Sequence, residues 1–459
     1  MKRYESIANP GILPVEDIPY LAPEDFKTTI LSQIGAGRRI GMLGLMPSLD
    51  DLENHNLPPH HPLLLAVLIA DDLQAFLIFA TDPQVSTSLN RETIAIKAFM
   101  PDLMQPSSQQ NALLTPCSYT LHEHNVQEEW CYTLEGPVVI EAHCEHQLAG
   151  LFLGEAMLQA KSPLAFLQCA TSLPVAQGYA FAIIDEVFGD CHIEENVQKA
   201  RFILLEIERA KQYVRTLRKT AAALGLDFLA RAYAKIYHKL AFCCERLTGT
   251  TTGKWSIFPG GVRFFPFNLE PAIDEILLHL HRCNRRFLNH PMVVSRLDSI
   301  GVIEAEIADE LGLSGFSARA CGRPFDIRKG LPYGFYRHID LDLSLTSGGS
   351  VYSRMIMAAH EAESALGLIR QQHPQIQDRQ HSVVPLKSKQ LALTAIEASS
   401  GQLIHAAVTN NTHQIVWYKI NDATTTHVPA IEKSLMGAFF DDRHLIVQSF
   451  ARHHAILAP

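Results

Sequence analysis

A long seam of apolar residues after Glu194 constrains the fold of this chain more than any other feature. Its members follow one another at alternating intervals of four and three residues: Ile203, Ile207, Ala210, Val214, Leu217, Ala221 and Leu224. This spacing places them on one face of a helix, which becomes stable by packing that face against other helices. Gly225 follows the last member, where a glycine commonly terminates a helix. We therefore expect a long helix that packs among further helices.

Three further helices are predicted by apolar spacing and by residues that start or stop helices. The second runs from about Asp227 to Leu247 and stops at Thr248-Gly249. The third has Pro271 in its first turn and ends near Pro291, because proline is tolerated at a helix start and interrupts a helix interior. The fourth begins at Tyr352 and carries Met355, Ala359, Ala362, Leu366 and Ile369 on one face. The large central part of the chain is therefore expected to be helical.

Short apolar or alternating runs predict β-strands at both ends of the chain. Asn410-Asn411 separates two such runs and indicates a hairpin. Alternation of apolar and polar residues also predicts a half-buried strand from Ile339 to Leu345. The other predicted strands are Leu63–Ala70, Ala75–Ala80, Thr93–Phe99, Val138–Ile140, Leu403–Val408 and Ile415–Ile420.

The chain divides most naturally near residue 130. Residues 1–130 read as a small N-terminal α/β segment, and the polar run from Met104 to Thr115 reads as a linker. Residues 131–459 hold the predicted long helices and form the second unit. A chain of 459 residues is long enough for two or three domains or one large domain with an appendage.

Composition excludes several classes of protein. The net charge is −9 and no basic stripe is present, so a nucleic-acid partner is not expected. The nine cysteines are odd in number and form no Cys-x-x-Cys pair, which indicates a reducing compartment. No apolar run approaches the ~20 residues of a transmembrane helix, and Met1–Glu5 leads into no signal-peptide core. Gly35-Ala36-Gly37 lacks the third glycine of a dinucleotide loop, so NAD binding by this chain is not expected.

Glycines punctuate the stretch from Arg296 to Leu368. Gly301, Gly312, Gly315 and Gly322 indicate backbone turns with positive φ or close approach. Asp326 and Arg328 flank Ile327, so on a strand they would share a face and form a buried ion pair. Such a pair more often fixes geometry than performs chemistry.

The order of motifs in this stretch resembles one superfamily. Arg296-Leu297-Asp298-Ser299-Ile300-Gly301-Val302-Ile303 is similar to its R-L-x-G-x-G-x-I segment, and Ser317–Gly322 and Asp326–Tyr333 are similar to its R-A-S-G and D-x-R-K-x-x-P-Y segments. The family comprises the large subunits of membrane-bound energy-converting NiFe hydrogenases and the quinone-site large subunit of respiratory complex I, its 49 kDa-type or D subunit. Glu206–Arg209 and Pro259–Val262 resemble further motifs of the family. The implied fold is α+β, a hydrogenase large-subunit-like long-helix bundle with peripheral β-hairpins. The N-terminal segment would correspond to a degenerate complex I 30 kDa-type domain.

The resemblance implies four thiolate ligands for a NiFe centre, and three of them are missing. The family's four cysteine positions correspond to Cys169, Ser172, His453 and Ile456. Soft thiolates are the ligands that such a centre requires. The family's arginine above the metal corresponds to Ser400, which carries no charge. A functional nickel site is therefore not expected, and we predict that no residue of this chain binds a metal.

The quinone site of the complex I relatives is also incomplete here. Their loop histidine has no counterpart in Leu151–Glu155, and Phe166 lies where a tyrosine is expected. A phenyl ring cannot donate a hydrogen bond to a quinone carbonyl. Tyr213 occupies the position of another family histidine. The family-core candidates that persist are Arg319, Asp326 and Arg328.

Histidine clusters and single cysteines invite a metal or nucleophile interpretation, but none has a recognised metal spacing. Cys169 lies near Leu167 and Leu173 and is expected to be buried and inert, and Cys243-Cys244 is expected to be core packing. The histidine-rich groups are His122 with His124, His143-Cys144-Glu145-His146, and His453-His454. We favour solvated or hydrogen-bonded histidines over metal ligands.

Two functions follow from the resemblance. The chain is expected to be either a subunit of a hydrogenase-like or NADH:quinone oxidoreductase-like complex that docks an iron–sulfur small subunit and supports electron transfer, or a catalytically silent scaffold of such a complex. An active hydrogenase is the third option. An iron–sulfur cluster would lie in the partner, a quinone is the candidate acceptor, and antiporter-like membrane subunits are further partners. The implied location is cytoplasmic, peripheral on the inner face of the cell membrane.

Overall fold

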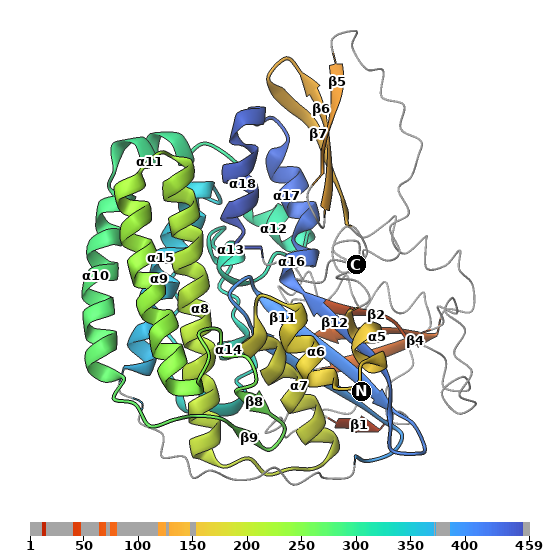
Figure 1. Ribbon diagram of the computed structural model, residues 1–459. Coiled ribbons are helices and arrows are strands. Elements are labelled where there is room, and N and C mark those ends of the chain that lie inside the picture. Colours follow the sequence, from red (N-terminus) through yellow and green to blue (C-terminus); the bar gives the residue numbers. More distant parts are fainter. Residues whose placement is uncertain are drawn as a thin grey trace.

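The computed structural model describes residues 12–14, 40–46, 64–69, 74–79, 118–124, 128–146, 153–370, 372 and 386–452. Several sequence predictions fall outside these ranges: the strand Thr93–Phe99, the linker Met104–Thr115, the turn Gly35–Gly37, and His453, His454 and Ile456. Figure 1 shows the arrangement of the described elements, with a helical layer on one side and sheets on the other.

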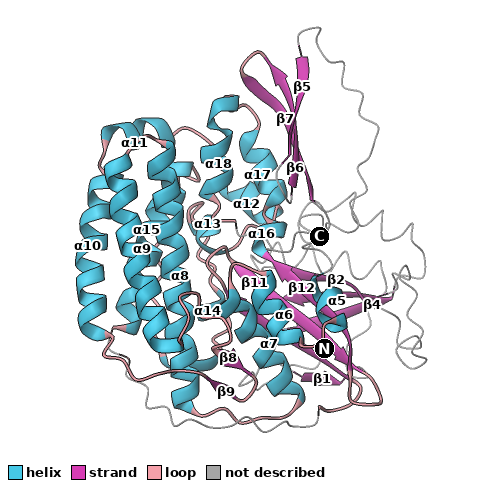
Figure 2. Cartoon of the chain, viewed as in Figure 1, coloured by secondary structure: helices cyan, strands magenta, loops and turns pink. Residues whose placement is uncertain are grey.

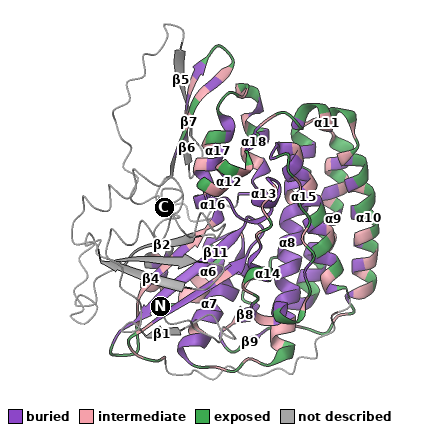
Figure 3. Cartoon of the chain, turned by 180° about the vertical axis from the view of Figure 1, so that it is seen from behind, coloured by how far each residue is buried: buried purple, intermediate pink, exposed green. Residues whose placement is uncertain are grey.

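Four long helices form the helical layer. They are α8 (Glu195–Ala223), α9 (Asp227–Thr248), α10 (Glu270–Leu288) and α15 (Val351–Ile369). α8 contacts α9 and α15, and α10 contacts the same two helices, so the four pack as a bundle (Figure 2). Figure 3 shows α8 buried along most of its length, whereas α9 and α10 each expose one face. The four predicted helices are confirmed.

The ends of these helices follow the predicted signals with one exception. Gly225 has φ +71°, and the Leu226 N–H donates to the Ala221 carbonyl at 2.9 Å, which closes α8 as a glycine-terminated helix. Gly249 ends α9 with φ +80°. Pro291 was expected to end the third helix, but α10 already ends at Leu288 and Pro291 is the first residue of α11 (Pro291–Leu297). Proline suits that position because its missing N–H has no intrahelical partner there.

A four-stranded antiparallel sheet lies beside the helical layer. Its order is β1 (Ile12–Pro14), β10 (Gln390–Glu397), β11 (Gln402–Thr409) and β12 (Ile415–Asp422). The β11–β12 pair is the hairpin that Asn410-Asn411 predicted. All eight residues of β11 are buried, and α7 (Pro174–Phe188) packs against β10 and β11. β11 therefore lies inside the molecule, whereas most residues of β12 are half-buried, and the peripheral position of the hairpins stays a prediction.

The remaining described strands form three smaller sheets. β2 (Ile40–Met46), β3 (Leu64–Ile69) and β4 (Gln74–Phe79) form one, and β3 and β4 match the predicted strands Leu63–Ala70 and Ala75–Ala80. β5 (Ser118–His124), β6 (Glu128–Glu135) and β7 (Val138–His146) form another, and β8 (Ile257–Phe258) pairs with β9 (Gly261–Val262). β6 runs through residue 130, and the division of the chain there stays a prediction.

The stretch from Arg296 to Leu345 folds into short elements joined by glycine turns. Gly301, Gly312, Gly315 and Gly322 all have positive φ, as predicted. The elements are α12 (Ala305–Glu310), α13 (Gly315–Arg319), α14 (Ile327–Gly330) and η4 (Gly334–His338). A Cβ on Gly315 would lie 2.4 Å from the Gly401 Cα, so these two backbones touch only because both residues are glycine.

Two strand predictions in this stretch are wrong. Residues 339–345 form no strand, because no other strand pairs with them, although Leu341 is buried and Asp340 and Asp342 are exposed. An alternating apolar and polar pattern shows that one side of a segment is buried. It does not show that a second strand forms hydrogen bonds with that segment. Asp326 and Arg328 also do not lie on a strand: Asp326 caps α14, and its carboxylate accepts from the Arg328 N–H at 2.9 Å.

The remaining helices are short. They are α5 (Leu153–Gln159), α6 (Pro163–Ala170), α16 (Ala423–Thr426), α17 (Val428–Leu435) and α18 (Arg443–Ser449), with the 3-10 turn η5 (Phe440–Asp442). Among the residues that the structure describes, no helix has both the length and the apolar surface that crossing a bilayer requires.

Candidate functional site

A cluster of buried ionic side chains joins the helical layer to the sheet. Arg319 lies at its centre: its Nη1 is 3.0 Å from an Asp326 oxygen and 3.0 Å from a Glu397 oxygen, and its Nη2 is 2.8 Å from Glu361. Arg319 and Glu397 are fully buried. α13, α14, α15 and β10 are thus fastened together at one guanidinium group.

Two further arginines extend this ion cluster to α8. The Arg328 Nη2 is 2.7 Å from Asp326 and its Nη1 is 3.2 Å from Glu206. The Arg209 Nη2 is 2.5 Å from Glu361, and its Nη1 donates to the Glu397 carbonyl oxygen at 3.1 Å. The ion pair predicted between Asp326 and Arg328 is confirmed. The ion cluster as a whole comprises Glu206, Arg209, Arg319, Asp326, Arg328, Glu361 and Glu397.

The charges of the ion cluster nearly balance. Four carboxyl groups face three guanidinium groups, so full ionisation would leave 3 − 4 = −1. Burial and the neighbouring Asp326 charge raise the pKa of Glu397, which moves the cluster toward neutrality. Burial would raise the pKa of Asp326 as well, but Arg328 and Arg319 together hold it well below its usual range. Every group is enclosed and paired, which is the arrangement expected of a structural ion cluster.

The first pair of ligand positions lies at the start of α7. Cys169 is in α6 and its side chain is exposed, contrary to the prediction that it would be buried. Ser172 lies between the two helices; its hydroxyl oxygen is buried and has no hydrogen-bond partner among the described residues. The Gln212 amide donates to the Ser172 carbonyl at 3.1 Å, which places this turn against α8. Phe166 is half-buried and packs against the core.

Glu208 fixes the start of α7 from outside the helix. Its two carboxylate oxygens accept the backbone N–H groups of Val175 and Ala176, each at 2.9 Å. The first N–H groups of a helix have no intrahelical partner, so a carboxylate here both caps the helix and meets its positive end. Complete burial raises the pKa of Glu208 to about 7, and the two N–H groups oppose that rise. This role was missed in the sequence, because nothing local to Glu208 identifies a helix more than 30 residues earlier as its partner.

Hydroxyl groups are present at two other positions that the family resemblance singled out. Ser400, at the position of the family's arginine, is buried in the turn between β10 and β11. Tyr213, at the position of a family histidine, is fully buried, and its hydroxyl has no hydrogen-bond partner among the described residues. Its ring packs edge-on against Phe316 at 5.5 Å between centroids. Burial raises the pKa of Tyr213, so its side chain is a neutral phenol.

A second polar network, which the sequence analysis did not identify, lies beside Ser400. The His405 Nε2 is 2.9 Å from the Gln177 Oε1, and its Nδ1 is 2.8 Å from the Tyr418 hydroxyl. The Gln177 amide donates to Asp422 at 3.5 Å. Burial lowers the pKa of His405 to about 3, so the imidazole is neutral. Burial raises the pKa of Asp422, against the influence of Thr424, Ser400 and Arg452.

This network has no signal in the local sequence. Gln177 comes from α7, whereas His405, Tyr418 and Asp422 come from the hairpin β11–β12. Its members meet only because α7 packs on that hairpin. His405 is neutral in this network, and the hydrogen bonds among the members fix the orientation of their side chains.

The histidine-rich groups gather no further ligands in the ranges that the structure describes. His143 lies 3.2 Å from Glu432, and the same carboxylate accepts the Cys144 N–H at 2.8 Å. In the register of the β5–β6 ladder, the Cα of His122 is paired with that of Cys131. No group of three or more histidine, cysteine, aspartate or glutamate side chains in these ranges is arranged to hold a metal ion. Cys243 and Cys244 are buried in the apolar core, as predicted.

The donors at the described ligand positions do not fit a NiFe centre. A hydroxyl at Ser172 is a hard donor that stays protonated, and Cys169 points to the surface. Such centres require soft thiolates that converge on one point. The side chain of Ser400 itself carries no positive charge. We therefore derive no chemistry through nickel.

Comparison with known proteins identifies relatives of the chain. Residues 237–392 match the family described as "Respiratory-chain NADH dehydrogenase, 49 Kd subunit". The carbon monoxide-induced hydrogenase of Rhodospirillum rubrum is 32% identical over 184 residues, which cover 39% of this chain and 49% of that protein. The D subunit of the NADH-quinone oxidoreductase of Thermosipho melanesiensis is 27% identical over 201 residues, covering 42% and 53%. The chain thus spans about half the length of these curated relatives.

A solved structure supports the same fold. A chain in the structure of the membrane-bound sulfane sulfur reductase, described as an archaeal respiratory membrane complex, superposes with a TM-score of 0.67 and 21% sequence identity. The match covers 73% of this chain and 97% of that chain. The resemblance predicted from the glycine and arginine motifs is confirmed by these comparisons.

Proposed function

We propose that this chain, a relative of the complex I 49 kDa subunits and of hydrogenase large subunits, serves as the large subunit of a membrane-associated redox complex and carries no NiFe centre. It would dock an iron–sulfur small subunit and support electron transfer through that partner to a quinone or similar acceptor. The single observation that carries the proposal is the contrast between the complete ion cluster and the hydroxyl groups at Ser172, Tyr213 and Ser400.

The ion cluster supports a retained large-subunit role. Arg319, Asp326 and Arg328 are the family-core residues that the sequence analysis singled out, and they join five elements through fully buried pairs. Removing one partner of a buried pair leaves an uncompensated charge, which typically costs 3–5 kcal/mol. A chain that had lost the whole role would have little reason to keep seven mutually dependent ionic side chains.

The substituted positions support loss of nickel chemistry in particular. A serine hydroxyl at Ser172 does not replace a thiolate, and Tyr213 is a buried neutral phenol. Some contacts at these positions do not depend on the identity of the side chain. The Gln212 contact to the Ser172 carbonyl, for example, requires only the main chain of residue 172.

Membrane association would come through partners. The described residues contain no helix suited to crossing a bilayer, and the relatives include subunits of membrane complexes. We therefore propose a peripheral position on the inner face of the membrane, next to antiporter-like subunits. The alternative function, a catalytically silent scaffold of the same complex, rests on the same substitutions.

The test is affinity purification of the tagged full-length chain from its native membranes under mild detergent. We expect an iron–sulfur subunit to co-purify and elemental analysis to find iron but nickel far below one atom per chain. Stoichiometric nickel would overturn the loss of the centre. Recovery of the chain without any iron–sulfur partner, at several detergent concentrations, would overturn the proposed complex.

A matched pair of variants separates electron transfer from the silent scaffold. Gln212→Leu removes the contact beside Ser172, and Arg323→Gln removes an exposed pair with Asp309 at 2.7 Å. If the complex transfers electrons past this chain, Gln212→Leu is expected to lower donor-to-quinone turnover in assembled complexes severalfold while Arg323→Gln leaves it unchanged. Equal turnover in both assembled complexes would favour the scaffold.

A further inference from the structure

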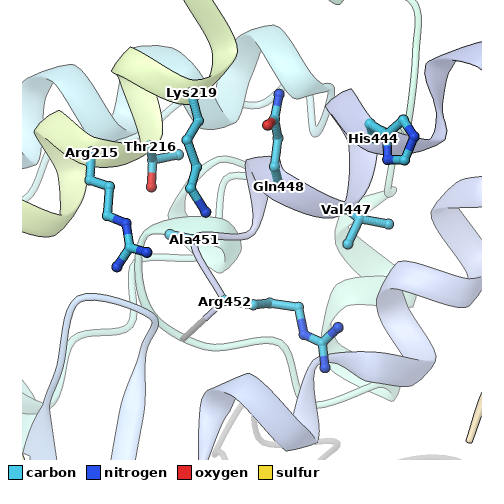
Figure 4. A pocket seen from close by; sticks show the side chains of 8 residues that line it. All are labelled: Arg215, Thr216, Lys219, His444, Val447, Gln448, Ala451 and Arg452. Atoms are coloured by element: carbon cyan, nitrogen blue, oxygen red, sulfur yellow. The ribbon is translucent and has the colours of Figure 1, made fainter. Parts of the chain in front are cut away.

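A cavity of about 180 Å³ lies between α8 and α18. One wall is formed by Arg215, Thr216 and Lys219 of α8, and the other by α18 and the residues that follow it (Figure 4). The second wall comprises His444, Val447, Gln448, Ala451 and Arg452. The figure shows the side chains of Arg215 and Lys219 descending from α8 on the same side of the cavity.

The lining of this cavity is cationic. Arg215, Lys219 and Arg452 carry positive charge, His444 adds an imidazole, and no aspartate or glutamate is among the described residues that line the space. No carboxylate of the described residues forms an ion pair with Arg215 or Lys219. Burial and the adjacent Arg215 and Arg218 charges lower the pKa of Lys219. Two cations held close together without counter-charges indicate a place for an anion.

The hydrogen-bonding groups of the cavity are mainly donors. Arg215 and Lys219 offer only N–H groups. The Gln448 Nε2 is buried and has no hydrogen-bond partner in the described part of the chain. The Thr216 hydroxyl donates its proton to the Gln212 carbonyl at 3.1 Å, so only its oxygen lone pairs face the cavity. A ligand with several acceptor oxygens matches this set.

We propose that this cavity binds a phosphate group, either as free phosphate or as the headgroup of an anionic lipid. Guanidinium and ammonium groups that lie one turn apart on one helix, as Arg215 and Lys219 do on α8, bind phosphate oxygens through charge-assisted hydrogen bonds. The volume accommodates one tetrahedral oxyanion with a few waters. The bound group would link α8 to the segment after α18.

The site is connected to the polar network beside Ser400. The Arg452 Nε donates to the Thr424 carbonyl at 3.1 Å, and Arg452 favours the charged form of Asp422. Arg452 thus belongs both to the cavity and to the surroundings of Ser400. Occupation of the cavity would therefore hold the end of α18 in place relative to the sheet.

The first test is thermal unfolding of the full-length chain in phosphate and in chloride at equal ionic strength. A ligand that binds only the folded state raises the melting temperature in proportion to the logarithm of its concentration. We expect phosphate to raise it by a few degrees, and the double variant Arg215→Gln/Lys219→Gln to weaken the apparent affinity at least about tenfold. Arg218→Gln is the matched control, because Arg218 lies on the same turn of α8 but does not line the cavity.

The outcomes of this test are distinct. An equal phosphate effect in the double variant and the wild type would overturn the site, as would a loss of the effect in Arg218→Gln alone. If the double variant does not fold, Lys219→Gln by itself provides the comparison, because Lys219 is not part of the apolar core. Calorimetric titration of the folded chain with inorganic phosphate measures the same affinities without thermal unfolding.

The second test identifies the source of the phosphate. The chain is sedimented with phosphatidylcholine vesicles with and without phosphatidic acid. Retention by phosphatidic acid in the wild type and Arg218→Gln, but not in the double variant, would assign a lipid headgroup. A phosphate effect without vesicle binding would assign free phosphate. Absence of both responses would refute the proposal.

Discussion

The ion cluster around Arg319 and the turn around Ser172 differ in how completely their buried polar groups are paired. In the ion cluster, every charge has a partner within about 3 Å, and five elements depend on it. In the turn, a buried hydroxyl has no partner among the described residues, and only backbone contacts hold residue 172. Under the proposed function, the comparison separates side chains that support the fold from positions where side chains that support chemistry were replaced. It also predicts very different costs for mutations at the two places.

Removing the central arginine should have the largest effect. Arg319→Met leaves Asp326, Glu361 and Glu397 without their shared counter-charge, so we expect a loss of about 3–5 kcal/mol in the free energy of unfolding. Urea denaturation of the full-length chain measures this directly.

The control for that variant is an arginine at the surface. Arg323→Gln removes a pair with Asp309 whose side chains are both about one-third exposed, and we expect a cost below about 1 kcal/mol. Similar costs for the two variants would contradict the structural role of the ion cluster.

Glu208 should make stability depend on pH. Its pKa in the folded chain is raised to about 7, above its ordinary value of ~4.3. Between these values the folded state binds more protons than the unfolded state, so stability falls as pH rises from about 4.5 to about 7. We expect a fall on the order of 1–3 kcal/mol at this group.

The pH dependence is isolated by subtraction. Glu208→Gln keeps the size of the side chain and cannot titrate, so the difference between wild-type and variant unfolding curves should contain this fall alone. A difference that rises with pH over the same window would show that the two N–H groups from Val175 and Ala176 outweigh burial.

The sequence predicted the parts of the molecule that depend on local signals. The seam from Ile203 to Leu224 determined α8, and Gly225 and Gly249 determined two helix ends, because these features need no knowledge of distant partners. Asp326 and Arg328 are two residues apart, and their pairing was also predictable, although the strand assigned to them was wrong.

The parts that were missed depend on packing between distant segments. Gln177 meets Asp422 across 245 positions and His405 across 228 positions, and neither pairing has a local pattern. Cys169 was expected inside because Leu167 is close in sequence. On a helix, however, residues two apart point about 200° away from one another, so α6 buries Leu167 and exposes Cys169.

Removing the unpaired hydroxyls should cost little or nothing. Ser172→Ala and Tyr213→Phe each delete a buried hydroxyl that has no partner among the described residues. We expect a change between no effect and a gain of about 1 kcal/mol in stability, because an unsatisfied polar group loses its hydration on folding without compensation.

A serine with partners provides the control for these two variants. The Ser449 hydroxyl accepts from the Arg354 Nε at 2.8 Å and donates to the Ile446 carbonyl at 2.6 Å, so Ser449→Ala should cost about 1–3 kcal/mol. If Ser172→Ala proved as costly as Ser449→Ala, the turn would hold a partner that depends on its hydroxyl, and the contrast with the ion cluster would weaken.

The smallest effect is expected at Phe166. Phe166→Tyr supplies the hydroxyl that the quinone-binding relatives are expected to use, yet we expect no gain in quinone reductase turnover by the assembled complex. The histidine of their loop is also missing from the sequence here, and Gly154 in the corresponding stretch is closely packed: a Cβ there would lie 2.2 Å from the Tyr418 carbonyl oxygen. A tyrosine at position 166 would therefore lack the second hydrogen-bond donor that the resemblance implies. The measurement compares turnover in complexes that contain wild type and Phe166→Tyr at equal amounts. A clear gain would show that a quinone site near Phe166 needs only one added hydroxyl for activity. The site would then retain more of its function than its substitutions indicate.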